Sequence, residues 1–512
     1  MKLYSEGKDY KLYHGNMLDM LEVIKPNSID SIITDPPYGL TSITKRFGKE
    51  DSAPTQYGRD GSFARLSKGF MGKEWDGSGI ETNVDAWKKC YEVLKPGGFL
   101  LAFGGDRTIH RIACAIEDAG FIIKNTLMYL YGTGFPKGLN VGLAIDKMNG
   151  VESKVVGFGK SGTTSRAFQS EELTTAGSYE MKQAQNIWGG YNTALKPAFE
   201  PIIVAQKPVE KSVVYNIMKY GVGAYNIDEC RIGNELIKGG TMPKMNDGEQ
   251  GVCNFNTIGA DRIDREDTLG RYPSNVIHDG SDAVIRDMPN TKSGTDVSFG
   301  SVRKAQEDNL YKLGFSQKEN DIQYAPDNYG DEGSASRYFK ECKFSEKDDL
   351  YDFPFSYFYG PKASKEDRDE GLGDDFEEKE CTSALNTKNG SGERLDGGAT
   401  PVRKNIHPTV KNCQLMQYLV RLVSPKGATI LDCFNGSGST GKAVMFENKE
   451  RNANYKYIGI ELTDEYLPIS KARIEYVINN DFDFWKDENG KTQHEVVKKN
   501  KNQMSIFDFE VE

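Results

Sequence analysis

The sequence lacks the features that mark membrane-spanning, secreted and metal-stabilised proteins. Its 512 residues contain no apolar run of roughly 18, the length that a transmembrane helix needs. Residues 1–6 show no apolar signal region. The eight cysteines are scattered without a Cys-x-x-Cys pair, which argues against a zinc ribbon and a disulfide framework. We therefore expect a cytoplasmic protein that contacts no membrane and needs no metal ion.

The sequence also has fewer basic than acidic residues. Lys and Arg number 65 against 75 Asp and Glu, which gives a net charge of −10. This balance disfavours a nucleic-acid partner at first sight, because phosphate contacts depend on Lys and Arg. The acids, however, gather at 348–352, at 366–380 and near the C-terminus, whereas several basic residues lie between 45 and 111. A local basic cleft on an acidic protein would be enough to bind DNA.

The most informative feature present is the tetrapeptide Asp35-Pro36-Pro37-Tyr38. It follows an apolar run, 31–34, that reads as a buried strand, and two prolines there end the strand and stiffen the turn. One carboxylate, one proline carbonyl and one aromatic ring are thereby held together. Such a set suits an amino group on a flat heteroaromatic ring, since both oxygens accept N–H groups while the tyrosine stacks. The tetrapeptide alone is equally compatible with an ordinary turn.

A second motif lies almost 400 residues later. The sequence predicts a strand at 428–432, a glycine-rich loop and then a helix, and Gly436 and Gly438 begin a G-x-G-x-x-G pattern in that loop. Glycines at such a place allow a tight turn and a close approach to a ligand. The next predicted strand, 456–460, ends in Glu461, where an acid can bind both hydroxyls of a ribose. By itself this half would suggest an NAD-dependent enzyme.

Together the two motifs resemble those of the DNA amino-methyltransferases, which methylate the exocyclic nitrogen of adenine or cytosine. Phe434, Gly436 and Gly438 match the family's Phe-x-Gly-x-Gly motif, so the resemblance implies S-adenosylmethionine (SAM) as the cofactor in place of NAD. The catalytic motif comes first, the target recognition region second and the SAM motif last, which is the β arrangement. Further segments resemble phage and bacterial members of the family: 13–18, 94–98, 103–105, 132–137, 196–201 and 407–411.

The resemblance and the alternating strand and helix patterns imply an α/β fold. We expect a Rossmann-like SAM-dependent methyltransferase sheet assembled from N- and C-terminal segments, with a large inserted recognition region. The glycine loop and the catalytic turn should meet at the carboxyl ends of adjacent parallel strands. The expected parts are a catalytic half at 1–210 with flexible insertions at 40–79 and 151–195, a target recognition region at 211–400, a SAM-binding half at 401–480 and a charged tail at 481–512.

The resemblance also assigns roles to individual residues. Asp35, Pro36, Pro37 and Tyr38 are the implied catalytic residues, with direct attack on the methyl group and no covalent enzyme intermediate. Where relatives usually carry an acid, this chain has Asn16, which keeps an acceptor oxygen but loses the charge, so that somewhat weaker cofactor binding is expected. The implied cofactor-binding residues are Asn16, Thr409, Lys411, Asp432, Phe434, Gly436, Gly438 and Glu461.

The expected activity is site-specific methylation of adenine N6 in double-stranded DNA, after the base has been flipped out of the helix. Asp35 favours adenine, because Asp is commoner at this position in adenine-N6 enzymes and Ser in cytosine-N4 enzymes. Methylation of cytosine N4 stays open as an alternative. More remote alternatives are a non-catalytic DNA-binding protein and an NAD-dependent enzyme. The sequence leaves open the recognition site, the oligomeric state, and whether the chain serves a restriction-modification system or a phage in its bacterial host.

A short apolar cluster, Gln503 to Phe507, interrupts the charged tail. It resembles the peptide Gln-Leu-Ser/Asp-Leu-Phe by which bacterial proteins dock on the replication sliding clamp. Docking at that clamp is therefore one expectation. Two alternatives remain: the five-residue match is a coincidence, or the segment folds back onto the protein's own core.

Overall fold

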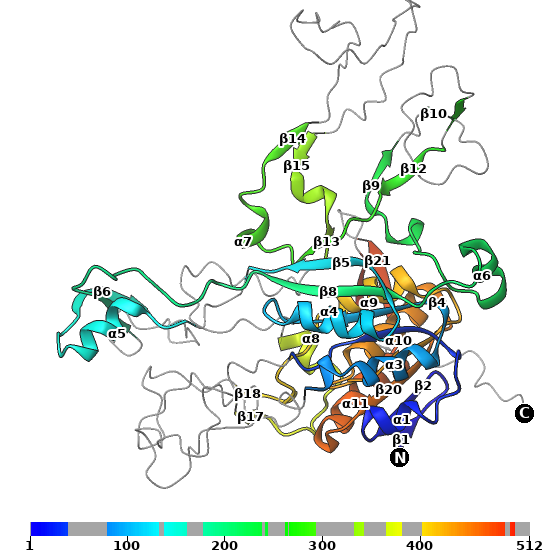
Figure 1. Ribbon diagram of the computed structural model, residues 1–512, viewed down its shortest axis with the longest axis horizontal. Coiled ribbons are helices and arrows are strands. Elements are labelled where there is room, and N and C mark those ends of the chain that lie inside the picture. Colours follow the sequence, from blue (N-terminus) through cyan, green and yellow to red (C-terminus); the bar gives the residue numbers. More distant parts are fainter. Residues whose placement is uncertain are drawn as a thin grey trace, which may run out of the picture.

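The central feature of the fold is a ten-stranded sheet in which segments from both ends of the chain alternate (Figure 1). The computed structural model describes residues 2–38, 79–132, 138–160, 178–237, 241–243, 262–264, 266–292, 332–342, 365–380, 402–486 and 492–496. In sheet order the strands are β1 (Lys2–Glu6), β2 (Tyr10–His14), β20 (Lys456–Glu461), β19 (Thr429–Asp432), β3 (Ile29–Thr34), β4 (Leu94–Phe103), β8 (Phe199–Gln206), β5 (Ile122–Leu130), β13 (Val276–His278) and β16 (Lys340–Glu341).

The strands β2, β20, β19, β3 and β4 are parallel to one another. Strand β8 runs antiparallel between β4 and β5, while β13 and β16 continue parallel to β5. The C-terminal strands β19 and β20 thus lie between the N-terminal strands β2 and β3. The prediction of an α/β methyltransferase sheet assembled from both ends of the chain is confirmed.

Helices cover both faces of the sheet, as the alternation of side chains along a buried strand requires. All six residues of β3 are buried, and Ile32 and Ile33 belong to two different hydrophobic cores. One core contains α1 (Met17–Leu21), α3 (Val84–Val93) and α4 (Ile109–Asp118), and the other contains α9 (Cys413–Val423), α10 (Ser439–Arg451) and α11 (Leu467–Asn479).

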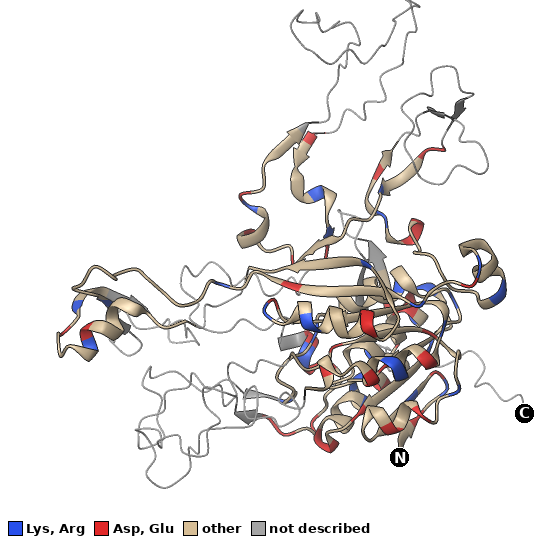
Figure 2. Ribbon diagram, in the orientation of Figure 1, with Lys and Arg blue, Asp and Glu red and all other residues tan. Residues whose placement is uncertain are grey.

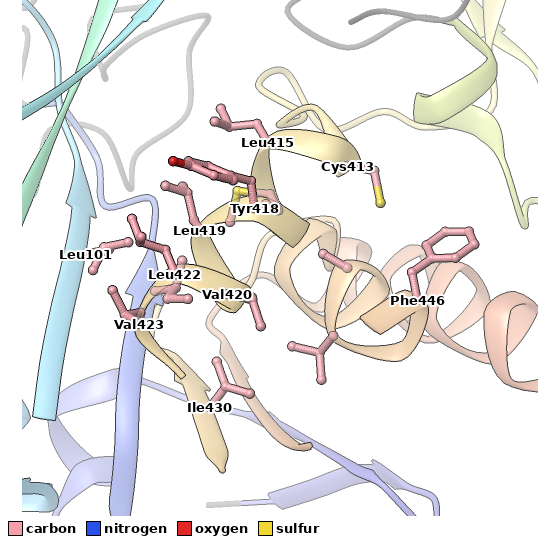
Figure 3. Close-up of a cluster of buried hydrophobic side chains, with 14 of the residues drawn as sticks. Leu101, Cys413, Leu415, Tyr418, Leu419, Val420, Leu422, Val423, Ile430 and Phe446 are labelled. Atoms are coloured by element: carbon pink, nitrogen blue, oxygen red, sulfur yellow. The ribbon is translucent and has the colours of Figure 1, made fainter. Parts of the chain in front are cut away.

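The second core shows how the C-terminal helices pack on the N-terminal strands. Leu422 and Val423 of α9 lie beside Leu101 of β4, and Phe446 projects from α10 (Figure 3). Helix α10 is buried from Ser439 to Glu447, since α9 and α11 flank it. The SAM half and the catalytic half therefore share one core and fold as one unit.

Some described parts of the range 211–400 join the main sheet and core, while the expected assignment of this range to target recognition stays a prediction. Strands β13 and β16 from this range extend the main sheet, and α8 (Lys365–Asp369) packs against the glycine loop side of the core. The physical reason is pairing: β13 satisfies the free edge of β5. Other described elements project from the sheet in Figure 1, namely β9 (Ile232–Ile237), β12 (Thr268–Arg271), α7 (Asp282–Ile285), β14 (Asn290–Lys292) and β15 (Glu332–Ser334).

The remaining pieces are short. The described part of 151–195 contains an antiparallel hairpin of β6 (Lys154–Lys160) and β7 (Ser178–Gln183) that projects from the sheet beside α5 (Val141–Met148) (Figure 1). Helix α6 (Val213–Tyr220) follows β8. Small pairs are β10 (Thr241–Pro243) with β11 (Arg262–Asp264), and β17 (Lys379–Glu380) with β18 (Val402–Arg403). The expected insertion at 40–79 lies outside the described residues except for its last residue.

The start of the expected tail packs against the folded core through Phe482 and Phe484. Residues 481–486 include β21 (Phe482–Lys486), which pairs with β22 (Thr492–Val496). The ring of Phe482 lies 5.1 Å from that of Phe446, so burial of an aromatic side chain fixes this segment. Gln503 to Phe507 lie outside the described residues. Within the described helices, none has the length and apolar character to span a bilayer.

Candidate active site at the carboxyl edge of the sheet

Four neighbouring parallel strands end at the same edge, and each delivers one of the predicted site residues. Asn16 follows β2, Glu461 ends β20, Asp432 ends β19 and Asp35 follows β3. The expected meeting of the glycine loop with the catalytic turn is therefore present, since β19 and β3 are adjacent. This edge is where open α/β sheets bind their ligands.

Asp432 ties the two motifs together directly. Its Oδ1 accepts a hydrogen bond of 2.6 Å from the hydroxyl of Thr34 and one of 3.1 Å from the Phe434 amide, and its Oδ2 accepts one of 2.6 Å from the Thr440 hydroxyl. Burial raises the pKa of Asp432 to about 6, against the opposing effect of these bonds. Both oxygens thus hold β3, the glycine loop and α10 together. Its expected contact with the methionine end of the cofactor stays a prediction.

The catalytic turn leaves β3 with Pro36 and Pro37 buried and Asp35 and Tyr38 partly exposed. Oδ2 of Asp35 lies 3.0 Å from Nζ of Lys411. Oδ1 is buried and has no hydrogen-bond partner among the described residues. Burial raises the pKa of Asp35, while Lys411 opposes the shift. The turn therefore presents one anchored and one unused carboxylate oxygen.

Two further residues, Glu200 and Lys411, contact Asp35 and Tyr38. We call these four residues the active-site cluster. The ammonium of Lys411 lies 3.0 Å from Oε1 of Glu200 and donates a hydrogen bond of 2.8 Å to the Tyr38 hydroxyl. The Tyr38 hydroxyl donates in turn to Glu200 Oε1. The side chains of Lys411 and Glu200 are only 6% and 2% exposed. One ammonium thus stands between two carboxylates and a phenol.

The rings around the cluster are fixed as well. Lys411 Nζ lies 4.7 Å from the ring centre of Phe103 and 5.2 Å from that of Tyr38, within cation–π range. The Thr108 hydroxyl donates a hydrogen bond of 2.6 Å to the Tyr38 carbonyl. Tyr38 is held at both its backbone and its hydroxyl, which leaves its ring orientation little freedom.

Glu200 was not among the predicted site residues, and the expected role of Lys411 at the cofactor stays a prediction, although its ammonium contacts the catalytic turn. Glu200 lies in a segment quoted only for its resemblance to the family, and Lys411 was expected to bind the cofactor. The structure brings Lys411 to the catalytic turn. One signal was available for Glu200: an acid inside the apolar run of a predicted strand is costly to bury unless it has a partner.

The glycine loop has a conformation that needs its glycines. Gly436 and Gly438 have φ angles of +51° and +75°, in the left-handed region. A Cβ atom at Gly436 would lie 2.7 Å from Nε2 of His407, and one at Gly438 would lie 2.4 Å from Oγ of Ser470. The protein's own packing, and not only a ligand, therefore requires both glycines.

Glu461 closes the loop from the neighbouring strand. Its carboxylate accepts hydrogen bonds of 2.6 Å from the Gly436 amide and 2.8 Å from the Thr463 amide. Burial raises the pKa of Glu461 to about 7. Each carboxylate oxygen has a second lone pair for a ligand hydroxyl. Glu461 can thus hold the loop and accept hydrogen bonds from a ribose at the same time.

The other predicted cofactor residues differ in exposure. Phe434 is half-buried and packs against the core, while its neighbours from Ile430 to Glu447 are otherwise buried. Asn16 is exposed, and its side chain caps α1 by accepting a hydrogen bond of 2.9 Å from the Leu18 amide. Thr409 is half-buried two residues before Lys411.

His407 supports the loop as a neutral packing residue. Burial lowers the pKa of His407 to about 3, and its Nδ1 accepts a hydrogen bond of 3.3 Å from the Thr409 amide. Its ring packs edge-on against Tyr466, with the ring centres 4.5 Å apart. Its position explains why a side chain at Gly436 has no room.

A second group of charges lies behind the glycine loop, and we call it the loop-support cluster: the buried Lys442 and Arg473 with the partly exposed Asp367 and Glu370. Lys442 is fully buried, with Nζ 2.6 Å from Oδ1 of Asp367 and 2.7 Å from Oε2 of Glu370. Arg473 donates hydrogen bonds to the carbonyl of Ser437, at 2.9 Å, and to that of Asp367, also at 2.9 Å. Segment 365–370 was assigned to target recognition, so sequence analysis missed this cluster.

The donor set at this edge fits the expected cofactor. A buried carboxylate at a strand end suits a ribose, a half-exposed phenylalanine suits an adenosine or a methionine chain, and the left-handed loop brings backbone close to both. Within the described ranges, no group of three or more His, Cys, Asp or Glu side chains could hold a metal ion.

The chain is similar to several known methyltransferases. The chain is 22% identical over 365 residues to the type II methyltransferase M.HindIII of Haemophilus influenzae, covering 65% of this chain and 99% of that protein. It is 38% identical over 82 residues to the type II methyltransferase M.BglI of Bacillus subtilis, covering 15% of this chain and 22% of that protein. Among solved structures, the cytosine-N4-specific PvuII DNA methyltransferase gives a TM-score of 0.34 at 10% identity, covering 93% of this chain and 94% of that chain.

The widest match is to a family. The sequence model of the DNA methylase family matches residues 29–472. That span begins at β3, includes the catalytic turn and the glycine loop, and ends within α11. The chain therefore belongs to the DNA methylase family of N6/N4 methyltransferases, whose methyl donor is S-adenosylmethionine.

Proposed function

We propose that this protein methylates N6 of adenine at a specific site in double-stranded DNA. The observation that carries the proposal is the buried Oδ1 of Asp35, which has no hydrogen-bond partner among the described residues and lies in the same turn as Tyr38, beside the strand that leads into the glycine loop. A planar amino group is the ligand that such a pair suits. The relatives named type II methyltransferases support DNA as the substrate.

The target base has to leave the duplex to reach this edge of the sheet. Tyr38 would stack on the flipped base, a contact worth about 1–3 kcal/mol in comparable cases. Asp35 Oδ1 and the Pro36 carbonyl would then accept the two amino hydrogens and direct the nitrogen lone pair toward the methyl group. Pro37 keeps the turn rigid. Positioning of the two reactants supplies much of the rate in this scheme.

SAM, when bound, supplies a methyl group on a positively charged sulfur. The residues proposed to hold it come from the glycine loop and its neighbours. Glu461 would accept hydrogen bonds from the ribose hydroxyls, Phe434 would pack against the cofactor, and Asn16 would meet the adenine end. Gly436 and Gly438 shape the loop, Asp432 fixes its base, and Thr409 lines the same side.

The base itself rests on one residue. Asp35 favours adenine N6 over cytosine N4, because family members that act on adenine more often carry Asp at this position. Cytosine N4 is the second candidate. A catalytically dead DNA-binding protein and an NAD-dependent enzyme are remote, since both motifs are intact.

Contacts with DNA are proposed for two places. The elements of 211–400 that project from the sheet would read the sequence, and exposed Arg107 and Arg111, just beyond the carboxyl end of β4, would meet phosphates. Lys and Arg are interspersed with Asp and Glu along the described elements (Figure 2), which suits a local contact surface. The activity would serve DNA modification in a bacterial or phage-infected cytoplasm, with or without a partner endonuclease.

The test is to incubate the purified protein with tritiated SAM and mixed-sequence duplex DNA. The DNA is then digested to nucleosides, which mass spectrometry identifies. We expect N6-methyladenine at one sequence, mapped by sequencing of the modified DNA. Detection of N4-methylcytosine would show that cytosine, and not adenine, is the target base. The absence of any methylated nucleoside would refute the proposed function. A nicotinamide absorbance change would favour the NAD alternative.

Docking of Gln503 to Phe507 on a bacterial sliding clamp is a separate proposal, outside the described residues. An enzyme held there would meet newly made, unmodified DNA. A peptide covering 498–512 should bind a bacterial clamp with micromolar affinity and lose binding on Phe507→Ala. The variant should methylate free DNA normally. Absence of binding at high micromolar clamp concentration would end the proposal.

A further inference from the structure

We propose that Lys411 and Glu200 are positioning residues that dedicate one oxygen of Asp35 to the target amino group. This inference rests on the proposed function and adds two residues to it. Lys411 anchors Oδ2, which leaves Oδ1 free to accept a hydrogen bond from the base. Glu200 anchors the Tyr38 hydroxyl and shares the same ammonium.

The hydrogen-bonding capacity of Lys411 supports this role. An ammonium has three donors, and three acceptors surround it: Asp35 Oδ2 at 3.0 Å, Glu200 Oε1 at 3.0 Å and the Tyr38 hydroxyl at 2.8 Å. Its side chain is 6% exposed. No donor is left for a cofactor carboxylate, which is why we assign Lys411 to the catalytic turn and not to SAM.

The backbone around Lys411 fixes its direction. The next residue, Asn412, caps α9 by accepting a hydrogen bond of 2.9 Å from the Leu415 amide, and α9 packs on the sheet. The ammonium therefore has a fixed place relative to β3. Asp35 Oδ2 is paired with this ammonium. Rotation of the carboxylate away from the target amino group would therefore break the ion pair with Lys411.

The charges around Asp35 work in opposite directions. The titratable groups that face it are Lys411 from the segment before α9, Glu200 from β8, Tyr38 from its own turn and Asp432 from β19. Lys411 lowers the pKa of Asp35, whereas burial and Glu200 raise it. Only the ionised carboxylate accepts hydrogen bonds at both oxygens, so this balance decides how much of the enzyme is competent at a given pH.

The roles of Lys411 and Glu200 can be tested separately, because the two residues shift the pKa of Asp35 in opposite directions. Lys411→Met removes the charge that lowers the Asp35 pKa, so the acidic limb of the kcat profile should move to higher pH. Glu200→Gln removes a charge that raises it, so the limb should move to lower pH. Lys411→Arg keeps the charge and should restore the limb toward its original place. At neutral pH, Lys411→Met should lower kcat about 100-fold, the effect of misplacing a reacting group.

The experiment measures single-turnover methyl transfer as a function of pH, and SAM affinity by calorimetry, for the full-length protein and these variants. Lys426→Met and Glu210→Gln, at residues outside the active-site cluster, are matched controls and should behave as the unmodified protein. SAM affinity should stay within about threefold in Lys411→Met, since no contact to the cofactor is removed.

Several outcomes would overturn the inference. An unchanged profile in Lys411→Met, or weaker SAM binding with an unmoved limb, would return Lys411 to the cofactor site. Shifts of the same sign in Lys411→Met and Glu200→Gln would indicate general loosening of the site. If Lys411→Met fails to fold, Glu200→Gln, which keeps shape and volume, carries the test.

Failure of the proposed function would be visible separately. If the unmodified protein methylates no DNA, the Asp35 carboxyl can still be titrated by carbon NMR. Its pKa should rise in Lys411→Met and fall in Glu200→Gln. The absence of both shifts would overturn the positioning roles, whatever the activity.

Discussion

Two buried lysines of this protein have the same chemical surroundings and different tasks. Lys411 lies between Asp35 and Glu200 at the open edge of the sheet, and Lys442 lies between Asp367 and Glu370 behind the glycine loop. The difference lies in the carboxylates that face each lysine. In the active-site cluster one oxygen of Asp35 is buried without a partner, whereas Lys442 belongs to a network that also holds loop carbonyls through Arg473.

The comparison shows how a buried ion pair can serve either function or stability. Burial lowers the pKa of Lys442, but the nearby Asp367 and Glu370 outweigh it and raise the pKa, which favours the charged form. Such a pair fixes geometry, although replacing all its charges by apolar groups could be neutral. In the active-site cluster the unused oxygen costs free energy that a bound amino group would return. Arg473 Nε in the loop-support cluster is also buried without a hydrogen-bond partner among the described residues, so the distinction lies in the carboxylate oxygen at the open edge of the sheet and not in the unsatisfied atom alone.

The largest effect is expected at that atom. Asp35→Ala should lower methyl transfer by about 100-fold or more, because one oriented acceptor is lost from the transition state. Asp35→Asn keeps shape without charge and should also be impaired. Both variants should bind SAM with unchanged affinity by calorimetry. Near-normal turnover by purified Asp35→Ala would move the chemistry to another residue.

The second expectation concerns the other lysine. Lys442→Met should destabilise the protein by about 3 kcal/mol, since the partly buried carboxylates of Asp367 and Glu370 would lose the ammonium that lies between them. Urea unfolding measures this loss, and the midpoint should fall. The triple replacement of Lys442, Asp367 and Glu370 by apolar residues should recover part of it. A Lys442→Met protein with unchanged stability would show that the two clusters differ less than their contacts suggest.

The sequence predicted the elements that are local and left out those that long-range packing creates. The catalytic turn, the glycine loop and the α/β sheet follow from short motifs next to apolar runs. The cluster around Asp35 does not, because Tyr38 is 162 residues from Glu200 and 373 from Lys411. No periodicity relates positions that far apart.

The same reason explains why the contacts of the segment around α8 were not predicted. The segment around α8 is polar and was grouped with target recognition on composition. Asp367 and Glu370 are in fact paired with Lys442, and Asp367 also with Arg473, so these acids are polar in sequence and only partly exposed in the fold. Composition cannot separate a solvated charge from a paired one. The roles of the individual cofactor residues stay predictions for the experiments described here.

A smaller effect, on cofactor affinity, tests the acid at the end of β20. The folded protein raises the pKa of Glu461 to about 7 from 4.5, so the site is partly protonated at neutral pH. The ionised form accepts both ribose hydroxyls, and SAM affinity should therefore rise about tenfold between about pH 6 and pH 8. Calorimetry at both values checks this. Glu461→Gln should bind more weakly and lose the pH dependence, whereas a retained dependence would point to another titrating group.

The sign for stability is the opposite of the sign for binding. A carboxyl group with a raised pKa binds its proton more tightly in the folded state, so its contribution to stability is present at low pH and is lost as pH rises from about 4.5 through 7. Without SAM, the unfolding midpoint of the Glu461→Gln variant should therefore change less over this range than that of the unmodified protein.

The smallest effect is expected at a third lysine, which completes the series from buried to exposed. Lys219 of α6 donates hydrogen bonds of 3.0 Å and 2.8 Å to the two oxygens of Glu210, but the side chains are 44% and 36% exposed. Water already solvates both charges and salt screens their attraction.

Helix α6 is held instead by Asn216, which is fully buried and donates hydrogen bonds to the carbonyls of Pro96 and Val222. Lys219→Met should therefore leave the urea midpoint unchanged, while Asn216→Ala should lower it. A loss of stability in Lys219→Met as large as in Lys442→Met would mean that burial does not decide what these lysines do.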